Sequence, residues 1–226
     1  MAKKKTSRKE LLKVTDEFLT FSSKVVNFIT THLRELKYAG FAIAILVVAY
    51  LGVTTYLRYV NKNGQNAYNT AYQTLTKEMK PDANPDNLRK SEELFIKVTD
   101  DYGLSKVARL ALPQIAYLKF LDKKYDEAIV LYRKFLDKVS GNTEYELMAN
   151  LALAACFEAK GDLKTAMETL IPVVEIPDNS FREPAMLSLA RLYRLDNRPE
   201  KAREILNEFV EQHADSPLLP FAKAQL

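Results

Sequence analysis

The chain has 226 residues and a net charge of +4, with 47% hydrophobic and 27% charged residues. These values are ordinary for a folded protein and leave room for one domain plus an anchor, or for two small domains. The charge is uneven, because residues 1–37 carry a net +5 and the remainder nets −1, so a nucleic-acid-binding role has little electrostatic support.

The first 37 residues combine a basic tail, MAKKKTSRK, with an amphipathic stretch. From Leu11 to Ile29, apolar residues recur at steps of three and four, which predicts one apolar face of a helix. Such a helix either lies flat on the cytoplasmic membrane surface or packs on a partner helix. We therefore expect residues 1–37 to form a basic tail and an amphipathic juxtamembrane helix.

An uncharged run follows, YAGFAIAILVVAYLGVTTYL, from Tyr38 to Leu57, with Lys37 before it and Arg58 after it. At about 1.5 Å per residue, such a helix covers about 30 Å, the thickness of the hydrocarbon core of a bilayer. A secretory signal peptide has a shorter apolar core and lies nearer the N-terminus. We therefore expect an uncleaved transmembrane helix over residues 38–60.

The orientation of this helix depends on the basic residues around it. The counts within twenty residues of the run are equal on the two sides: Lys24, Arg34 and Lys37 before it, and Arg58, Lys62 and Lys77 after it. The further Lys and Arg residues of the tail break the tie. We expect the tail to stay in the cytoplasm and the C-terminal part to cross the membrane.

Past the run, the sequence repeats itself in residues 108–136, 145–174 and 182–210. Each stretch contains two alanines twelve residues apart, namely Ala116 and Ala128, Ala154 and Ala166, and Ala190 and Ala202. Large apolar residues follow the second alanine by four and seven positions: Tyr132 and Phe135, Leu170 and Val173, and Leu206 and Phe209. The second alanine recurs at intervals of 38 and 36 residues.

This spacing predicts pairs of antiparallel helices. Small residues at a fixed offset let two helix axes approach, and the bulky residues one turn further fill the space to the next pair. A single pair cannot bury its apolar face alone, so pairs stack into a solenoid. The expected fold is all-α, with a single N-terminal transmembrane helix followed by an α-solenoid of helix pairs over residues 65–226.

Two less regular segments flank the three repeats. Before them, residues 65–79 and 87–102 form a degenerate pair around the loop PDANPD, with Ser91, Phe95 and Val98 in the places of Ala128, Tyr132 and Phe135. After them, residues 214–226 begin one more helix. We expect Ser216 to cap that helix and Pro217 to take its first position.

The repeats resemble the tetratricopeptide repeat, whose small eighth and twentieth positions match the alanine pairs. The usual Trp and the Gly-Tyr of its first helix are missing here. The resemblance implies a protein-binding groove on the first helices, apolar and aromatic at one end and basic at the other. Its residues are Leu110, Pro113, Tyr117, Phe120, Met148, Leu151, Glu158, Leu187, Arg191 and Arg194.

The whole layout is similar to the bacterial ancillary translocon-subunit family. The similarity rests on the short tail, the single anchor, AYNTAYQ in the first helix, Tyr102-Gly103 and the final SPLLPFAKAQL. It implies a single-pass inner-membrane protein with a periplasmic repeat domain that associates with the protein-export channel and with extracytoplasmic chaperones. The long amphipathic N-terminal segment departs from the family and leaves the partner open.

Residues for chemistry are scarce. The sequence has no glycine-rich phosphate loop and no Cys or His cluster, and its single cysteine, Cys156, excludes an internal disulfide. We expect no enzyme activity, no cofactor, no metal and no small-molecule substrate. The leading hypothesis is a membrane-anchored protein-binding adaptor. The alternatives are a scaffold that coordinates cell-envelope or outer-membrane assembly, and a repeat adaptor that faces the cytoplasm.

Overall fold

A computed structural model describes residues 8–78 and 85–226, with side chains described for 20–77 and 88–226. Every regular element in these ranges is a helix, and no strand occurs within them, as expected for an all-α chain. The first seven residues of the basic tail and part of the expected loop 81–86 lie outside the described residues. The chain divides into two compact units, Met1–Tyr56 and Leu57–Leu226.

The first unit contains α1 (Arg8–Thr31) and the beginning of α2 (Leu33–Glu78). Helix α1 confirms the helix predicted from the apolar periodicity. Its described apolar side chains, such as Phe21 and Phe28, are exposed. Helix α2 is long and apolar enough to cross a membrane, with a mean hydropathy of 2.0 in its most apolar window and none of that window buried.

Helix α2 is one helix from Leu33 to Glu78, and it therefore contains both the uncharged run and the first residues of the second unit. The sequence predicted a transmembrane helix that ends at residue 60 and a repeat domain that begins at residue 65. Residues 61–64 are instead helical, and Val60 is already buried. The second compact unit therefore includes residues 57–64, which precede the predicted start of the repeat domain.

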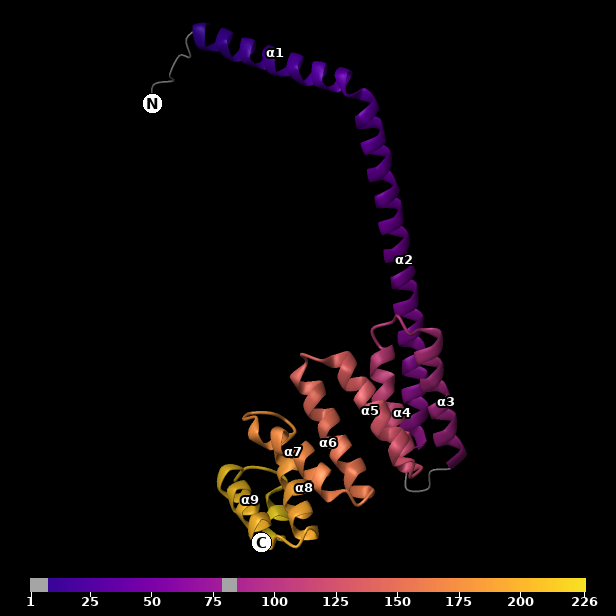
Figure 1. The fold of residues 1–226 in the computed structure, drawn as a ribbon, viewed down its shortest axis with the longest axis vertical. Helices are drawn as coiled ribbons and strands as arrows, with labels where there is room; N and C mark the ends of the chain where they lie inside the picture. The colour runs from indigo at the N-terminus through magenta and orange to yellow at the C-terminus, as the bar shows by residue number, and fades with distance from the viewer. Residues whose placement is uncertain (1–7, 79–84) are drawn as a thin grey trace. The chain divides into compact units, whose positions relative to one another are not determined.

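The second unit is a succession of helices in which each one packs on the next (Figure 1). Their bounds are α3 Pro85–Asp101, α4 Ala108–Leu121, α5 Tyr125–Val139, α6 Thr143–Ala159, α7 Leu163–Glu175, α8 Arg182–Leu195, α9 Pro199–Gln212 and α10 Leu219–Lys223. The three predicted repeats correspond to the pairs α4/α5, α6/α7 and α8/α9.

The alanine spacing correctly predicted the core of these pairs. All six paired alanines are at most 2% exposed, and so are Phe135, Leu170, Val173, Leu206 and Phe209. In the degenerate first pair, Ser91, Phe95 and Val98 are fully buried at the predicted positions. Ala71 on α2 is also fully buried, so the second half of α2 serves as the first helix of that pair.

The turn within each pair contains one residue in the left-handed region. These residues are Lys123 (φ 59°), Gly161 (φ 81°) and Asn197 (φ 57°), each seven positions after the first alanine of its repeat. Glycine adopts this conformation without steric cost and asparagine tolerates it, whereas lysine is strained there. The turn geometry is thus common to the three repeats, although only the second has the residue best suited to it.

The C-terminal helix begins later than predicted. Helix α10 starts at Leu219, with Leu218 as its N-cap, so Pro217 does not take its first position. The Oγ of Ser216 accepts a hydrogen bond from the backbone N–H of Leu218 at 3.0 Å. Leu218 is the N-cap residue, so this bond does not cap a residue inside α10. The backbone carbonyl of Ser216 accepts from Leu219, which makes a turn that leads into α10.

Candidate protein-binding groove

The residues predicted to form the groove lie on the first helices of three successive pairs. Helix α4 carries four of them, α6 carries three and α8 carries three. Arg191 and Arg194 are exposed, whereas Pro113 is buried within α4. The other seven are half-buried. Pro113 therefore supports the surface from below and is not available to a partner.

Several of the half-buried residues also have a packing role. Phe120 packs against the main core, with its ring 5.5 Å from that of Tyr125. Leu151 and Leu187 pack against the same core, and Leu110 and Met148 pack against a smaller one. These side chains present only part of their area to solvent. Tyr117 is also half-buried on α4, but unlike Phe120 it does not pack against any of the hydrophobic clusters.

The basic end predicted for the groove is largely satisfied within the chain. The Nε and Nη2 atoms of Arg191 donate to the two carboxylate oxygens of Glu158 at 2.8 and 2.7 Å. This bidentate pair raises the pKa of the Arg191 guanidinium. The Nη1 atom of Arg194 donates to the carbonyl of Gln225 at 3.4 Å, a long contact. The two arginines therefore do not form the open basic pair that the sequence suggested.

Two tyrosines of α2, Tyr68 and Tyr72, were not among the predicted groove residues and are candidates for the same surface. Tyr72 follows buried Ala71 as Tyr117 follows buried Ala116, so the two tyrosines hold equivalent positions on successive first helices. Tyr72 is 46% exposed, and its ring stacks on that of Tyr68 at 6.3 Å.

Tyr68 is set more deeply than Tyr72. Burial raises the pKa of the Tyr68 phenol, and the nearby Tyr72 phenol adds to the shift, while the Gln114 side chain on α4 opposes it. Tyr68 also packs edge-on against Phe95 at 5.5 Å. The match between AYQ at residues 71–73 and AYL at residues 116–118 was the sequence pattern from which Tyr72 could have been found.

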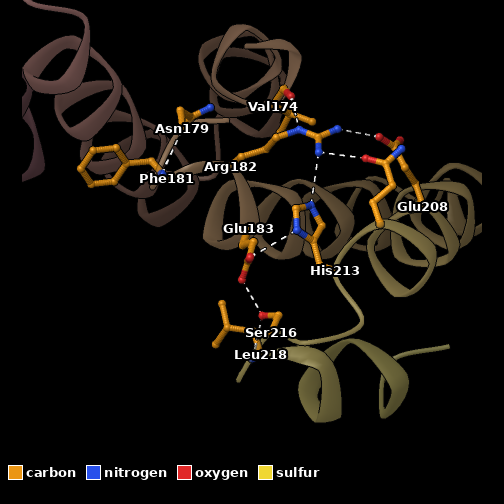
Figure 2. A network of polar contacts seen from close by, with 10 residues as sticks. Val174, Asn179, Phe181, Arg182, Glu183, Glu208, His213, Ser216 and Leu218 are labelled. Atoms are coloured by element: carbon orange, nitrogen blue, oxygen red, sulfur yellow. Dashed lines mark hydrogen bonds and ion pairs between the residues drawn. The ribbon is translucent and has the colours of Figure 1, made fainter. Parts of the chain in front are cut away.

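A polar network holds the last repeat together (Figure 2). The guanidinium of Arg182 donates to the carbonyl of Val174 at 2.9 Å, to Gln212 at 2.9 Å and to Glu208 at 2.8 Å. His213 lies between Arg182 and Glu183, 3.2 Å from each. The network joins α7, α8 and α9.

Ser216 donates a hydrogen bond to Glu183 and so ties the segment before α10 to this network (Figure 2). Each polar group has a partner from another part of the repeat. Since the network is satisfied internally, we assign it a structural role at the C-terminal end of the solenoid.

Metal-ligating and nucleophilic side chains were two candidate kinds of chemical group in this chain. No group of three or more His, Cys, Asp or Glu residues in that part of the chain is placed to hold a metal ion. Cys156 is fully buried in α6, and burial raises the pKa of its thiol to about 11. A buried, protonated thiol is a poor nucleophile, so Cys156 is a packing residue.

Comparisons with known proteins agree on the fold. A family model described as "Tetratricopeptide repeat" matches residues 184–216, which are α8, α9 and the following turn. A crystal structure of the tetratricopeptide-like repeats of a putative kinesin light chain from Podosopora anserina superposes with a TM-score of 0.58 at 18% identity. It covers 72% of this chain and 82% of that one.

A tetratricopeptide repeat protein from Parabacteroides merdae gives a TM-score of 0.57 at 14% identity, over 73% of this chain and 59% of that one. No curated protein sequence matches significantly. The fold and the matched repeat place the second unit in the class of tetratricopeptide-repeat-like α-solenoids. Within that class, identities this low establish the fold alone, and the partner must be argued from the surfaces of this chain.

Proposed function

We propose that the chain is a membrane-anchored protein-binding adaptor of the bacterial inner membrane, with its tail in the cytoplasm and its repeat unit in the periplasm. The observation that carries the proposal is the continuity of α2. One helix contains both the uncharged run that ends at Leu57 and the exposed Tyr72 of the first pair. At about 1.5 Å per residue, Tyr72 lies roughly 22 Å along the helix beyond the run. A partner bound there is held close to the membrane.

The binding surface consists of the first helices, with Tyr72 and Tyr117 as its aromatic anchors. Repeat solenoids bind through the surface that their first helices form, and partly exposed tyrosines are among the residues that contribute most at protein interfaces. The Glu158–Arg191 pair lies on the same series of helices. It gives that surface a neutral polar patch beside the aromatic one.

The partner we propose is the protein-export channel, together with extracytoplasmic chaperones that receive its substrates. This part of the proposal is supported by the resemblance in layout to the ancillary translocon-subunit family. It is also supported by the short stretch of α2, Leu57 to Tyr72, that separates the end of the uncharged run from the exposed tyrosine of the first pair. A scaffold for envelope assembly and an adaptor facing the cytoplasm are the other outcomes of the test.

The test is photo-cross-linking in living cells, with a photoreactive amino acid at Tyr72 or at Tyr117. Val130, 63% exposed on α5, is the matched control because it lies on a second helix. We expect export-channel subunits or periplasmic chaperones as adducts from the two tyrosine positions and not from Val130. Adducts with envelope-assembly proteins would replace the proposed partner, and adducts with cytoplasmic proteins would reverse the orientation.

A further inference from the structure

A cleft of about 580 Å³ lies between the last turn of α3, the segment that follows α3, the start of α4 and the last two turns of α5. Four basic side chains line it, Lys106, Arg109, Lys134 and Lys138, and no acidic residue is part of its lining. The cations come from three separate parts of the fold, so the repeat packing itself brings them together.

These four cations are unpaired within the described part of the chain, although Lys134 also lines a neighbouring cleft with Asp126 and Glu127. None of them forms an ion pair there, whereas other cations do, as Lys119 does with Glu92 and Glu127. Exposed Asp100 and Asp137 lie on the same helices but do not line the cleft. Like charges gathered around one cleft repel each other, and an anion that enters relieves this repulsion.

The cleft is fixed to α2 close to the end of the uncharged run. The backbone N–H of Lys106 donates to Oδ1 of Asn61 at 2.8 Å. Beside this bond, Gly64 lets the segment approach so closely that a Cβ there would lie 2.7 Å from Oγ of Ser105. Asn61 is four residues beyond Leu57, which is roughly 6 Å along the helix.

The distance from Leu57 to Asn61 is similar to the thickness of the lipid headgroup layer. A bilayer's polar regions add roughly 5–7 Å on each side of its hydrocarbon core. If the uncharged run spans that core, only four residues of chain separate its end at Leu57 from Asn61, so Asn61 and the Lys106 bonded to it stay near the headgroup layer. The inference therefore rests on the membrane span of the proposed function.

We propose that this cleft binds the phosphate groups of anionic phospholipids in the leaflet that faces the repeat unit. Lysine ammoniums and an arginine guanidinium are common phosphate ligands, and basic residues near a membrane surface are attracted to anionic lipid. The contact holds the repeat unit against the bilayer in one orientation. An acidic protein segment would need the same charges, but the short chain distance between the end of the uncharged run and Asn61, to which Lys106 is bonded, favours the lipid.

The experiment uses the full chain in vesicles of phosphatidylcholine, with or without phosphatidylglycerol as roughly one third of the lipid. A fluorophore is attached to Leu104→Cys, which is exposed two residues before Lys106, while the native Cys156 is buried. A lipid with a nitroxide on its headgroup quenches the fluorophore when the cleft is seated on the membrane. We expect phosphatidylglycerol to increase the quenching at least about twofold and about 0.5 M salt to remove the increase.

The decisive variant combines Lys106→Gln, Arg109→Gln, Lys134→Gln and Lys138→Gln, and it should lose the increase caused by phosphatidylglycerol. Its matched control makes the same charge change on later helices, with Lys164→Gln, Lys201→Gln, Arg203→Gln and Lys223→Gln, and should keep the increase. All eight residues are exposed, so we expect unchanged helicity by circular dichroism in both variants.

Three results would overturn the inference. The first is quenching that phosphatidylglycerol does not change, and the second is an equal loss in the control. The third is a cleft variant that keeps its lipid dependence but loses a protein cross-link in cells, which would assign the cleft to an acidic protein. Extraction of the chain from the vesicles by alkaline carbonate would instead show that the chain does not span the bilayer, and would contradict the proposed function as well. Failed quenching in an inserted chain affects the lipid site alone.

Discussion

Arg191 on α8 and Glu158 on α6 meet in a bidentate ion pair that joins the first helices of consecutive repeats. Both residues were predicted to face a partner, yet each satisfies the other within the chain. A ligand that uses either charge must therefore compete with an existing pair. The pair is a direct contact between α6 and α8, and it occupies two of the residues predicted for the groove.

A double-mutant cycle measures the strength of this pair. We expect Glu158→Ala and Arg191→Ala to be coupled by about 0.5–1 kcal/mol, because the arginine is half exposed and water screens the interaction. Urea unfolding of residues 57–226 of the two single variants and the double variant gives the coupling. Additive effects would show that the pair contributes nothing to the spacing of α6 and α8.

Gly64 is predicted to be indispensable to the contact between α2 and the segment after α3. A Cβ at this position would lie 2.8 Å from Cβ of Ser105 and 3.1 Å from Cβ of Tyr102. Overpacking of this kind costs about 1–3 kcal/mol, which outweighs the helix propensity of about 1 kcal/mol gained from alanine.

We therefore expect Gly64→Ala to lower the thermal midpoint. Adding Ser105→Gly to Gly64→Ala should recover part of the loss, because it removes both of the nearest atoms. The measurement is thermal unfolding followed by circular dichroism. A higher midpoint for Gly64→Ala alone would mean that α2 does not approach the segment this closely.

The left-handed turn residues predict a stabilising substitution. Lys123 has a φ of 59° where the equivalent residue of the next repeat is Gly161. Lys123→Gly should raise the free energy of unfolding by about 0.5–1 kcal/mol, since relief of the strain exceeds the entropy that glycine gains in the unfolded chain.

The reverse change, Gly161→Ala, should lower the free energy of unfolding by about 1 kcal/mol. No atom lies within 4 Å of a Cβ built at Gly161, so the effect isolates the backbone conformation. Urea unfolding of both variants checks the pair of predictions. If neither Lys123→Gly nor Gly161→Ala changes the free energy of unfolding, the three turns do not share one geometry.

A comparison of two fragments tests where the repeat unit begins. The sequence placed its start at Gln65, but the structure buries Val60 and bonds Asn61 to Lys106. We expect residues 57–226 to fold without the anchor into a helical, soluble unit. Residues 65–226 should melt at a lower temperature, because they lack both contacts and the close packing of Gly64. Equal melting temperatures would restore the boundary predicted from the sequence.

The repeat core could be predicted because it depends on local spacing. Alanines twelve residues apart, with bulky residues four and seven positions later, identify the faces that pack, and Ser91 kept the register even where alanine was absent. The continuity of α2 could not be predicted in the same way. The stretch NKNGQN looks like a helix terminus by propensity, and its helical state depends on tertiary contacts such as those of Gly64.

The groove was harder to predict than the core. Family offsets placed the predicted residues on the first helices of three pairs, but they could not show that Pro113 is buried or that Glu158 and Arg191, 33 residues apart, pair with each other. Such pairing depends on the rotation between successive repeats, which the spacing of alanines does not encode. The missed Tyr72 was accessible to sequence reasoning, because it follows Ala71 as Tyr117 follows Ala116.

Lys119 gives the last prediction, because it joins three helices. Its Nζ lies 2.8 Å from Glu92 on α3 and 2.9 Å from Glu127 on α5, while Lys119 and Glu92 are each only 17% exposed. The hydrogen bonds to Glu92 and Glu127 raise the pKa of the Lys119 ammonium. Lys119→Met should cost about 1–2 kcal/mol near neutral pH, because it leaves the half-buried Glu92 carboxylate without its partner.

The raised pKa fixes the direction of the pH dependence. A group whose pKa is higher in the folded state contributes fully below its unfolded pKa, about 10.4 for lysine, and loses that contribution as the pH rises through the folded value. The difference in unfolding free energy between the wild type and Lys119→Met should therefore be constant from pH 7 to about pH 9.5 and shrink at higher pH. Urea unfolding at a series of pH values measures this difference, and Lys164→Met, at an exposed position of α7, is the control. A difference that stays constant above pH 10.4, or a control that behaves alike, would contradict the role of Lys119 as the charged centre of this contact.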